Sequence, residues 1–143
     1  DSVPMSREIK GLEKSVWEAM PNAPSMEYHL SGVLTEGVVK RGALMQNLVD
    51  LMTRRPAEIF GIFPRKGILL PGSDADIVVI NMEKRHKVNR EQIHSGTPFS
   101  LFEGLELAGW PVAVIKGGRL VIRDGKWVAD PPPSKVLNEI RKK

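Results

Sequence analysis

Two glycine-containing dipeptides, Gly117-Gly118 and Asp124-Gly125, separate three short apolar runs near the end of the chain. The favoured two-residue hairpin turns need positive φ at both central positions, a conformation that Gly adopts freely and Asp tolerates. The apolar runs are of strand length and rich in Val and Ile. Residues 112–128 therefore predict an antiparallel meander of three strands.

The chain has helical periodicity between residues 43 and 61. Leu44 and Leu48 belong to an apolar series at helical spacing, which predicts an amphipathic helix of about three turns. Pro56 predicts the start of a second short helix, because proline is favourable at the first helical position. Gly61 is a typical stop residue, so we expect two helices ahead of the β region.

Two further apolar runs, KGILL at residues 66–70 and DIVVIN at residues 76–81, predict strands. Residues 89–110 predict a short helix and a compact loop. We therefore expect a β-rich centre from Lys66 to Val128. The first 35 residues are punctuated by proline and glycine, and they predict a long irregular loop with short helical patches rather than part of a domain core.

Asp74 and Asp76 stand two residues apart in PGSDADIVVI, directly before an apolar run. A catalytic zinc usually needs three protein ligands, and His29, His86 and His94 show no paired spacing. Asp side chains bond nearby backbone amides and so favour turns. We interpret Asp74 as a turn residue and Asp76 as the first residue before a buried strand, not as a metal-binding pair.

The formal net charge is +4, and the last nine residues carry four cations and one carboxylate, a net +3. Most of the excess positive charge therefore lies in the tail, which argues against nucleic-acid binding by the body of the chain. Residues 134–143 predict a terminal helix capped by Ser134. The chain lacks cysteine, a signal-peptide pattern and an apolar run of the about 18 residues that a membrane span needs. We therefore expect a soluble cytoplasmic protein.

A resemblance to a known family is carried by PAEIFGIFPRKGILLPGSDADIVVI, residues 56–80, and by HSGTPFSLFEGLELAGWPVAVIKGGRLVIRDGKW, residues 94–127. These segments resemble the C-terminal region of the cyclic amidohydrolases, in particular the hydantoinase/dihydropyrimidinase family, and are also similar to allantoinase and dihydroorotase. The resemblance runs from Asp1 to about Val128.

The resemblance implies an α/β region followed by a β region, in a chain that is part of a longer protein. Residues 1–63 would form the end of a (β/α)8 barrel, with its strand-8 loop and final helices. Residues 64–130 would form a small β-sandwich domain, and residues 131–143 a basic C-terminal tail.

The resemblance also assigns roles to Asp1 and Asn22. DSVPM places Asp1 at the family's eighth-strand aspartate, which implies a metal ligand and a catalytic proton shuttle. MPNA places Asn22 where the family often has Ile-Pro-Asn-Gly, which implies substrate binding through its backbone. The parent protein would hold two divalent metal ions, zinc by expectation, through histidines and a carboxylated lysine that this chain lacks. The isolated chain should then bind no metal tightly and be inactive.

The expected substrate is a small cyclic amide, such as a hydantoin, a dihydropyrimidine or a related ureide. The expected partners are the remainder of the barrel and further copies in a homo-oligomer, without nucleic acid or membrane. An alternative is a non-catalytic, dihydropyrimidinase-related protein that acts through interaction and oligomerisation. Metal-ligating histidines and the lysine in the parent sequence would favour the enzyme, and their replacement would favour the non-catalytic protein.

Overall fold

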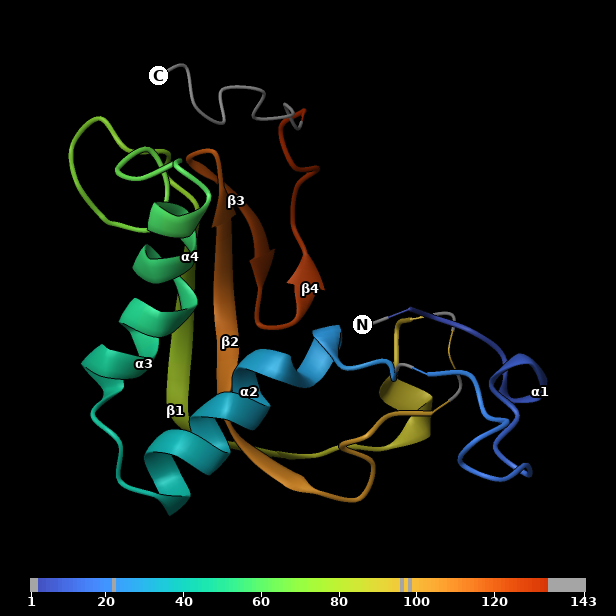
Figure 1. Cartoon of the computed structure of the whole chain (residues 1–143). Helices are drawn as coiled ribbons and strands as arrows, with labels where there is room; N and C mark the ends of the chain where they lie inside the picture. The colour runs from blue at the N-terminus through green and yellow to red at the C-terminus, as the bar shows by residue number, and fades with distance from the viewer. Residues whose placement is uncertain (1–2, 22, 96, 98, 134–143) are drawn as a thin grey trace. The chain divides into compact units, whose positions relative to one another are not determined.

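The computed structural model describes residues 3–21, 23–95, 97 and 99–133 (Figure 1). The chain divides into two compact units. The described residues of Asp1–Glu36 and Glu83–Trp110 form the first unit, and those of Gly37–Met82 and Pro111–Lys143 form the second. The division into these units does not coincide with the domain boundary expected near residue 63. That boundary refers to the domains of a larger protein, and it stays a prediction.

A four-stranded sheet has the order β1-β2-β3-β4, where β1 is Ile77–Lys87, β2 is Glu106–Lys116, β3 is Arg119–Arg123 and β4 is Lys126–Trp127. β2, β3 and β4 pair antiparallel, with Lys116 opposite Arg119 and Arg123 opposite Lys126. Both predicted dipeptides form the turns, and all four of their residues have positive φ. The predicted meander is confirmed.

β2 begins earlier than expected, because Glu106–Trp110 belongs to the strand and not to a loop. The cause is tertiary: the backbone of this part is bonded to two side chains from another segment. Ser31 Oγ donates to the Gly109 carbonyl at 2.8 Å, and the Ala108 amide donates to Thr35 Oγ1 at 2.8 Å. The short helix expected in the preceding segment is present as the 3-10 helix η3, Arg90–Gln92.

KGILL does not form a strand, so this prediction is wrong. Gly67 has φ +87°, outside the extended region, and it lies so close to the helix α4, Arg54–Ile59, that a Cβ there would meet the Ala57 Cβ at 2.8 Å. The Asp74 amide donates to the Arg65 carbonyl at 2.9 Å and closes the segment into a loop. Leu69, 70% exposed, lies on that loop.

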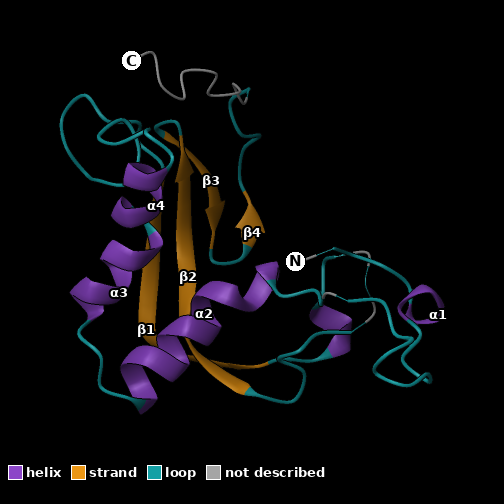
Figure 2. Ribbon diagram, in the orientation of Figure 1, coloured by secondary structure: helices purple, strands orange, loops and turns teal. Residues whose placement is uncertain are grey.

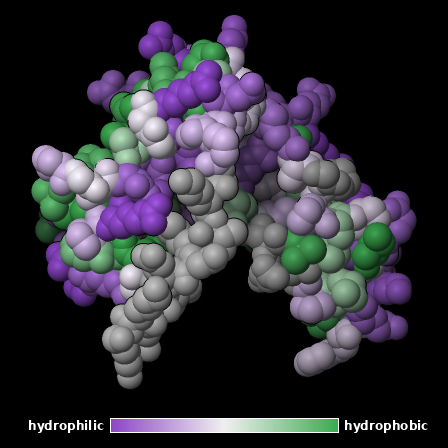
Figure 3. Space-filling view, turned by 90° about the horizontal axis from the view of Figure 1, so that it is seen from above, coloured by the Kyte–Doolittle hydropathy of each residue, from purple (hydrophilic) through white to green (hydrophobic). Residues whose placement is uncertain are grey.

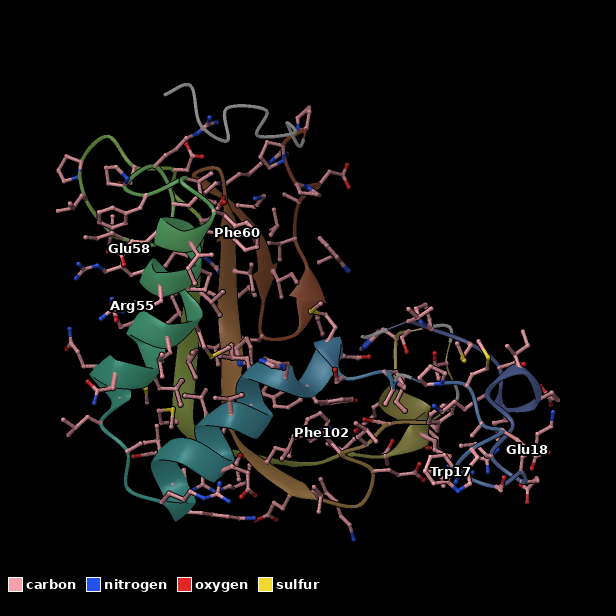
Figure 4. The ribbon with its side chains drawn as sticks, in the orientation of Figure 1. Trp17, Glu18, Arg55, Glu58, Phe60 and Phe102 are labelled. Carbon is pink, nitrogen blue, oxygen red and sulfur yellow. The ribbon has the colours of Figure 1, made fainter. Side chains whose placement is uncertain are left out.

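The two predicted helices are present as α3, Met45–Met52, and α4, Arg54–Ile59, which follow one another along the chain (Figure 2). α4 begins two residues before Pro56. Proline lacks an amide N–H, but the amides of a helix's first turn have no partner within the helix, so Pro56 is tolerated there. Gly61, with φ +67°, follows the end of α4 as predicted. On α4, Arg55 and Glu58 are labelled in Figure 4, and Arg55 Nη1 lies 3.6 Å from Glu58 Oε2.

The first 35 residues contain more structure than predicted. After the short helix α1, Arg7–Lys10, the chain forms a helical stretch from Met26 to Lys40, made of the 3-10 helix η1, Met26–Tyr28, the α-helix α2, His29–Val33, and the π-helix η2, Leu34–Lys40 (Figure 1). Tyr28 and Leu34 in this stretch are 3% and 1% exposed. The segment therefore belongs to a core, and the prediction of a peripheral loop is wrong for it.

The core of the first unit is a cluster of Tyr28, Val88 and Leu107, against which Ile93, Phe102 and Trp110 pack. Phe102 lies beside α2 (Figure 4). Its ring approaches Gly32 so closely that a Cβ at position 32 would lie 2.6 Å from Phe102 Cε1. Only glycine fits this approach without a shift of the ring.

Gly32→Ala should therefore destabilise the protein by up to about 2 kcal/mol. Overpacking costs about 1–3 kcal/mol, which exceeds the about 1 kcal/mol that Ala gains over Gly in a helix. Urea unfolding of wild type and variant measures the difference. A Phe102→Leu background, which removes the contacting ring edge, should reduce the cost of Gly32→Ala. An equal cost in both backgrounds would show that the contact is not the cause.

Hydrophobic residues reach the surface in several places (Figure 3). Val78 and Val79 on β1 are each 46% exposed, so the prediction of a buried strand after Asp76 is wrong. Among the described residues there is one sheet, and the β-sandwich stays a prediction. The described residues contain no helix long and apolar enough to cross a membrane.

Candidate functional site

A pocket of about 130 Å³ lies in the first unit. It is formed by three segments that are distant in sequence: the chain before α1, the chain around η1, and the loop after η3. Its lining residues are Pro4, Pro24, Ser25, Met26, Glu27, Tyr28, Ile93, Ser95, Phe99 and Ser100. Its apolar walls carry a few hydroxyl and carboxylate groups, as the walls of small-molecule sites do, but its volume is below that of a typical ligand site.

The three segments are held together by hydrogen bonds. The Met5 amide donates to Thr97 Oγ1 at 3.0 Å, and Tyr28 Oη donates to the Gln92 carbonyl at 3.4 Å. The His94 amide lies 3.2 and 3.1 Å from the two carboxylate oxygens of Glu27, and His94 Nδ1 lies 2.6 Å from Glu27 Oε1. Burial raises the pKa of Tyr28, which keeps its hydroxyl protonated as a donor.

The two predicted site residues, Asp1 and Asn22, lie outside the described residues. Their neighbours are described: Pro4 follows Asp1 by three positions and Pro24 follows Asn22 by two, and both prolines line the same pocket. The described residues that follow the two predicted positions therefore meet at one place in the first unit.

Asp74 and Asp76 lie elsewhere, in the second unit, and bond to cations and backbone. Asp76 accepts from the Gly117 amide at 2.8 Å, from Lys116 Nζ at 2.9 Å and from Lys66 Nζ. Asp74 Oδ2 accepts from Lys66 Nζ at 2.9 Å. Both carboxylates are thus neutralised by protein cations, which agrees with their interpretation as structural residues. The contacts that hold them differ from the expected bonds to nearby backbone amides, because they come from lysine side chains and from the distant Gly117 amide.

The pKa values of this pair follow from the same contacts. Partial burial raises the pKa of Asp76, but hydrogen bonds from Lys66, Lys116 and the Gly117 amide outweigh this effect and hold it far below its ordinary value. The hydrogen bond from Lys66 lowers the pKa of Asp74. Carboxylates that stay ionised in this way are suited to an ion-pair cluster rather than to proton transfer near neutral pH.

The histidines of the chain have separate environments. His86 stacks on Trp110 with ring centroids 4.6 Å apart, and His94 pairs with Glu27. Within residues 3–21, 23–95, 97 and 99–133, no three His, Asp or Glu side chains lie close enough together to hold a metal ion. The described residues alone do not fit a metal centre.

Sequence reasoning missed the pocket wall formed by the loop after η3 and by Glu27. The wall is built from contacts between segments that are distant in sequence, such as the contact of Glu27 with His94. A local sequence pattern does not predict such contacts. The available signal was the unusual length of the compact loop between the two β regions, since long loops are often functional.

Residues 14–121 match the model of the amidohydrolase family. The chain belongs to this family. An amidohydrolase relative, the L-hydantoinase of Paenarthrobacter aurescens, is 37% identical over 113 residues, which are 79% of this chain and 25% of the relative. The D-hydantoinase of Geobacillus stearothermophilus is 33% identical over 123 residues, 85% of this chain and 26% of that protein. The predicted resemblance is confirmed.

A solved amidohydrolase structure, the D-hydantoinase (dihydropyrimidinase) from Thermus sp., superposes with a TM-score of 0.81 and 36% identity. The match covers 91% of this chain and 29% of that one. The chain spans about a quarter of the length of the curated relatives it matches. It therefore shares the fold of one part of a hydantoinase.

Proposed function

We propose that the chain is part of a hydrolase that cleaves the cyclic amide bond of a hydantoin, a dihydropyrimidine or a related ureide. The supporting observation is the pocket at which the segments following Asp1 and Asn22 meet, in a chain that belongs to the amidohydrolase family. The hydantoinases it resembles are named for such substrates.

In this proposal Asp1 is the catalytic proton shuttle and a metal ligand, and the backbone of Asn22 binds the amide edge of the ring. Residues 1–63 belong to the end of a barrel, residues 64–130 to a β-sandwich and residues 131–143 to a basic tail. The pocket is smaller than the about 300–1,000 Å³ of typical ligand sites, which supports the view that its other walls come from the rest of a longer protein.

The amidohydrolase family is generally metal-dependent, and we propose that the parent protein holds two divalent ions, zinc by expectation. The ligands other than Asp1 would come from outside this chain, since the described residues contain no cluster of three candidate ligands. We also propose a homo-oligomer with a cytoplasmic location.

The test compares the full-length parent protein with the isolated 143-residue chain. We expect the parent to open hydantoin or dihydrouracil and to contain bound metal, and the isolated chain to do neither, because one carboxylate cannot replace a set of ligands. Metal analysis and a ring-opening assay measure both. Turnover by the short chain with stoichiometric zinc would refute the expected inactivity. If the parent protein neither contains metal nor opens these rings, the alternative is favoured, which is a non-catalytic protein that acts through oligomerisation.

A further inference from the structure

The loop after η3 contacts both segments that lead into the pocket. The first contact is the hydrogen bond from the Met5 amide to Thr97 Oγ1 at 3.0 Å. Thr97 is 1% exposed, so the acceptor lies in the interior, and the bond is partly buried. Met5 is four residues from Asp1, and the bond therefore anchors the segment that carries the proposed proton shuttle.

The second contact involves Glu27, five residues after Asn22. Its carboxylate accepts from the His94 amide and pairs with His94 Nδ1. The Glu27 side chain is 28% exposed, whereas that of His94 is 88% exposed, so the backbone bond is the more constrained part of the contact. This contact anchors the segment that follows the proposed substrate-binding residue.

The loop is itself held at its two ends. The Val88 amide donates to the Leu105 carbonyl at 3.0 Å, and the Gly104 amide donates to the Val88 carbonyl at 2.9 Å. Val88 is 1% exposed and belongs to the core cluster, and Arg90 Nε lies 2.6 Å from Glu103 Oε1. A loop closed on the core in this way can serve as a fixed support for the two segments that it contacts.

We propose that Thr97 and Glu27 are positioning residues that act on two different steps. Thr97 positions the segment of the proton shuttle, and Glu27 positions the segment that binds the cyclic amide. This inference rests on the proposed function. It predicts a separation of kinetic effects: loss of the Thr97 hydroxyl should lower kcat, and loss of the Glu27 carboxylate should raise KM.

The test uses the full-length parent protein with its metal bound. Thr97→Val keeps the side-chain shape but removes the acceptor of the Met5 amide, and kcat should fall about tenfold to 100-fold with KM changed less than about twofold. Thr97→Ser keeps the hydroxyl and should restore kcat. Glu27→Ala should raise KM about fivefold with little change in kcat, and Glu27→Gln, whose amide oxygen can still accept from His94, should have a smaller effect.

The matched control is Ser15→Ala, which removes a hydrogen bond from Ser15 Oγ to Glu18 in the same unit, away from the pocket-lining residues. It should leave both constants unchanged. If Thr97→Val and Glu27→Ala lower only Tm while the folded enzyme keeps its wild-type kcat and KM, the positioning roles are wrong. If both variants change kcat and KM alike, the separate assignment is wrong.

Hydrogen exchange separates this inference from the proposed function. Thr97→Val should speed exchange in the peptide containing Met5 but not in the peptide containing Glu27, and Glu27→Ala should speed exchange in the peptide containing His94. If exchange speeds up as expected but the wild-type parent is inactive, the anchoring of the two segments by the loop is supported and the proposed hydrolase function is wrong. Unchanged exchange in an active parent would overturn the anchoring and leave the hydrolase standing.

Discussion

Replacing Asp1 by Asn in the full-length protein should lower kcat by about 10²-fold to 10⁴-fold, the range that general acid–base groups contribute. Asn has the size of Asp but cannot take up a proton at neutral pH, so the proposed transfer to the departing ring nitrogen is lost. Ring-opening kinetics measure the effect. Metal analysis of the same variant shows whether the proposed ligand role of Asp1 is lost together with the proton transfer.

The matched control for Asp1→Asn is Asp74→Asn, the same chemical change in the ion-pair cluster. Asp74 bonds to Arg65 and Lys66, at 3.1 and 2.9 Å, and does not line the pocket. We expect this variant to keep its kcat and to show a lower Tm. A folded but inactive Asp74→Asn variant, together with normal turnover by Asp1→Asn, would reverse the assignment of the two aspartates.

Replacing Asp76 by Ala should lower the free energy of unfolding by about 2 kcal/mol. Hydrogen bonds to charged groups each contribute about 1.5–3 kcal/mol, and partial solvent screening reduces that value. The substitution also leaves Lys66 and Lys116, which converge on the same carboxylate oxygen, without their common counter-charge. Urea unfolding measures the loss. Asp50→Ala, which breaks an exposed ion pair with Arg55, should cost less than about 1 kcal/mol, and an equal cost would contradict the cluster's importance.

The contribution of Asp76 should depend on pH in a defined direction. Because its folded-state pKa is lowered, its stabilisation is fully present above the unfolded-state pKa of about 3.9 and is lost as the pH falls toward the folded-state pKa. The Tm difference between wild type and Asp76→Asn should therefore be constant at pH 5–7 and shrink below about pH 4. A difference that grows on acidification would contradict this sign.

Local chemistry was sufficient for the turns and for much of the secondary structure. Gly117-Gly118 and Asp124-Gly125 form hairpin turns because few residues accept positive φ at both central positions, and this requirement is visible in sequence. The sequence also indicated a structural role for Asp74 and Asp76, but not the ion pairs with Lys66 and Lys116 that hold them. The family was also visible in sequence, through the order and spacing of its motifs.

The sequence by itself determined the β meander, the two helices before it, the turn aspartates and the family, because these depend on backbone preference and short-range spacing. Only the tertiary structure decided that the helical stretch from Met26 is part of a core, that KGILL forms a loop, and that the segments after Asp1 and Asn22 share a pocket. Each of these depends on contacts between distant residues, such as Gly32 with Phe102 and Met5 with Thr97. Burial and hydrogen bonding over such separations outweigh local propensity, and no short window of the sequence contains both partners.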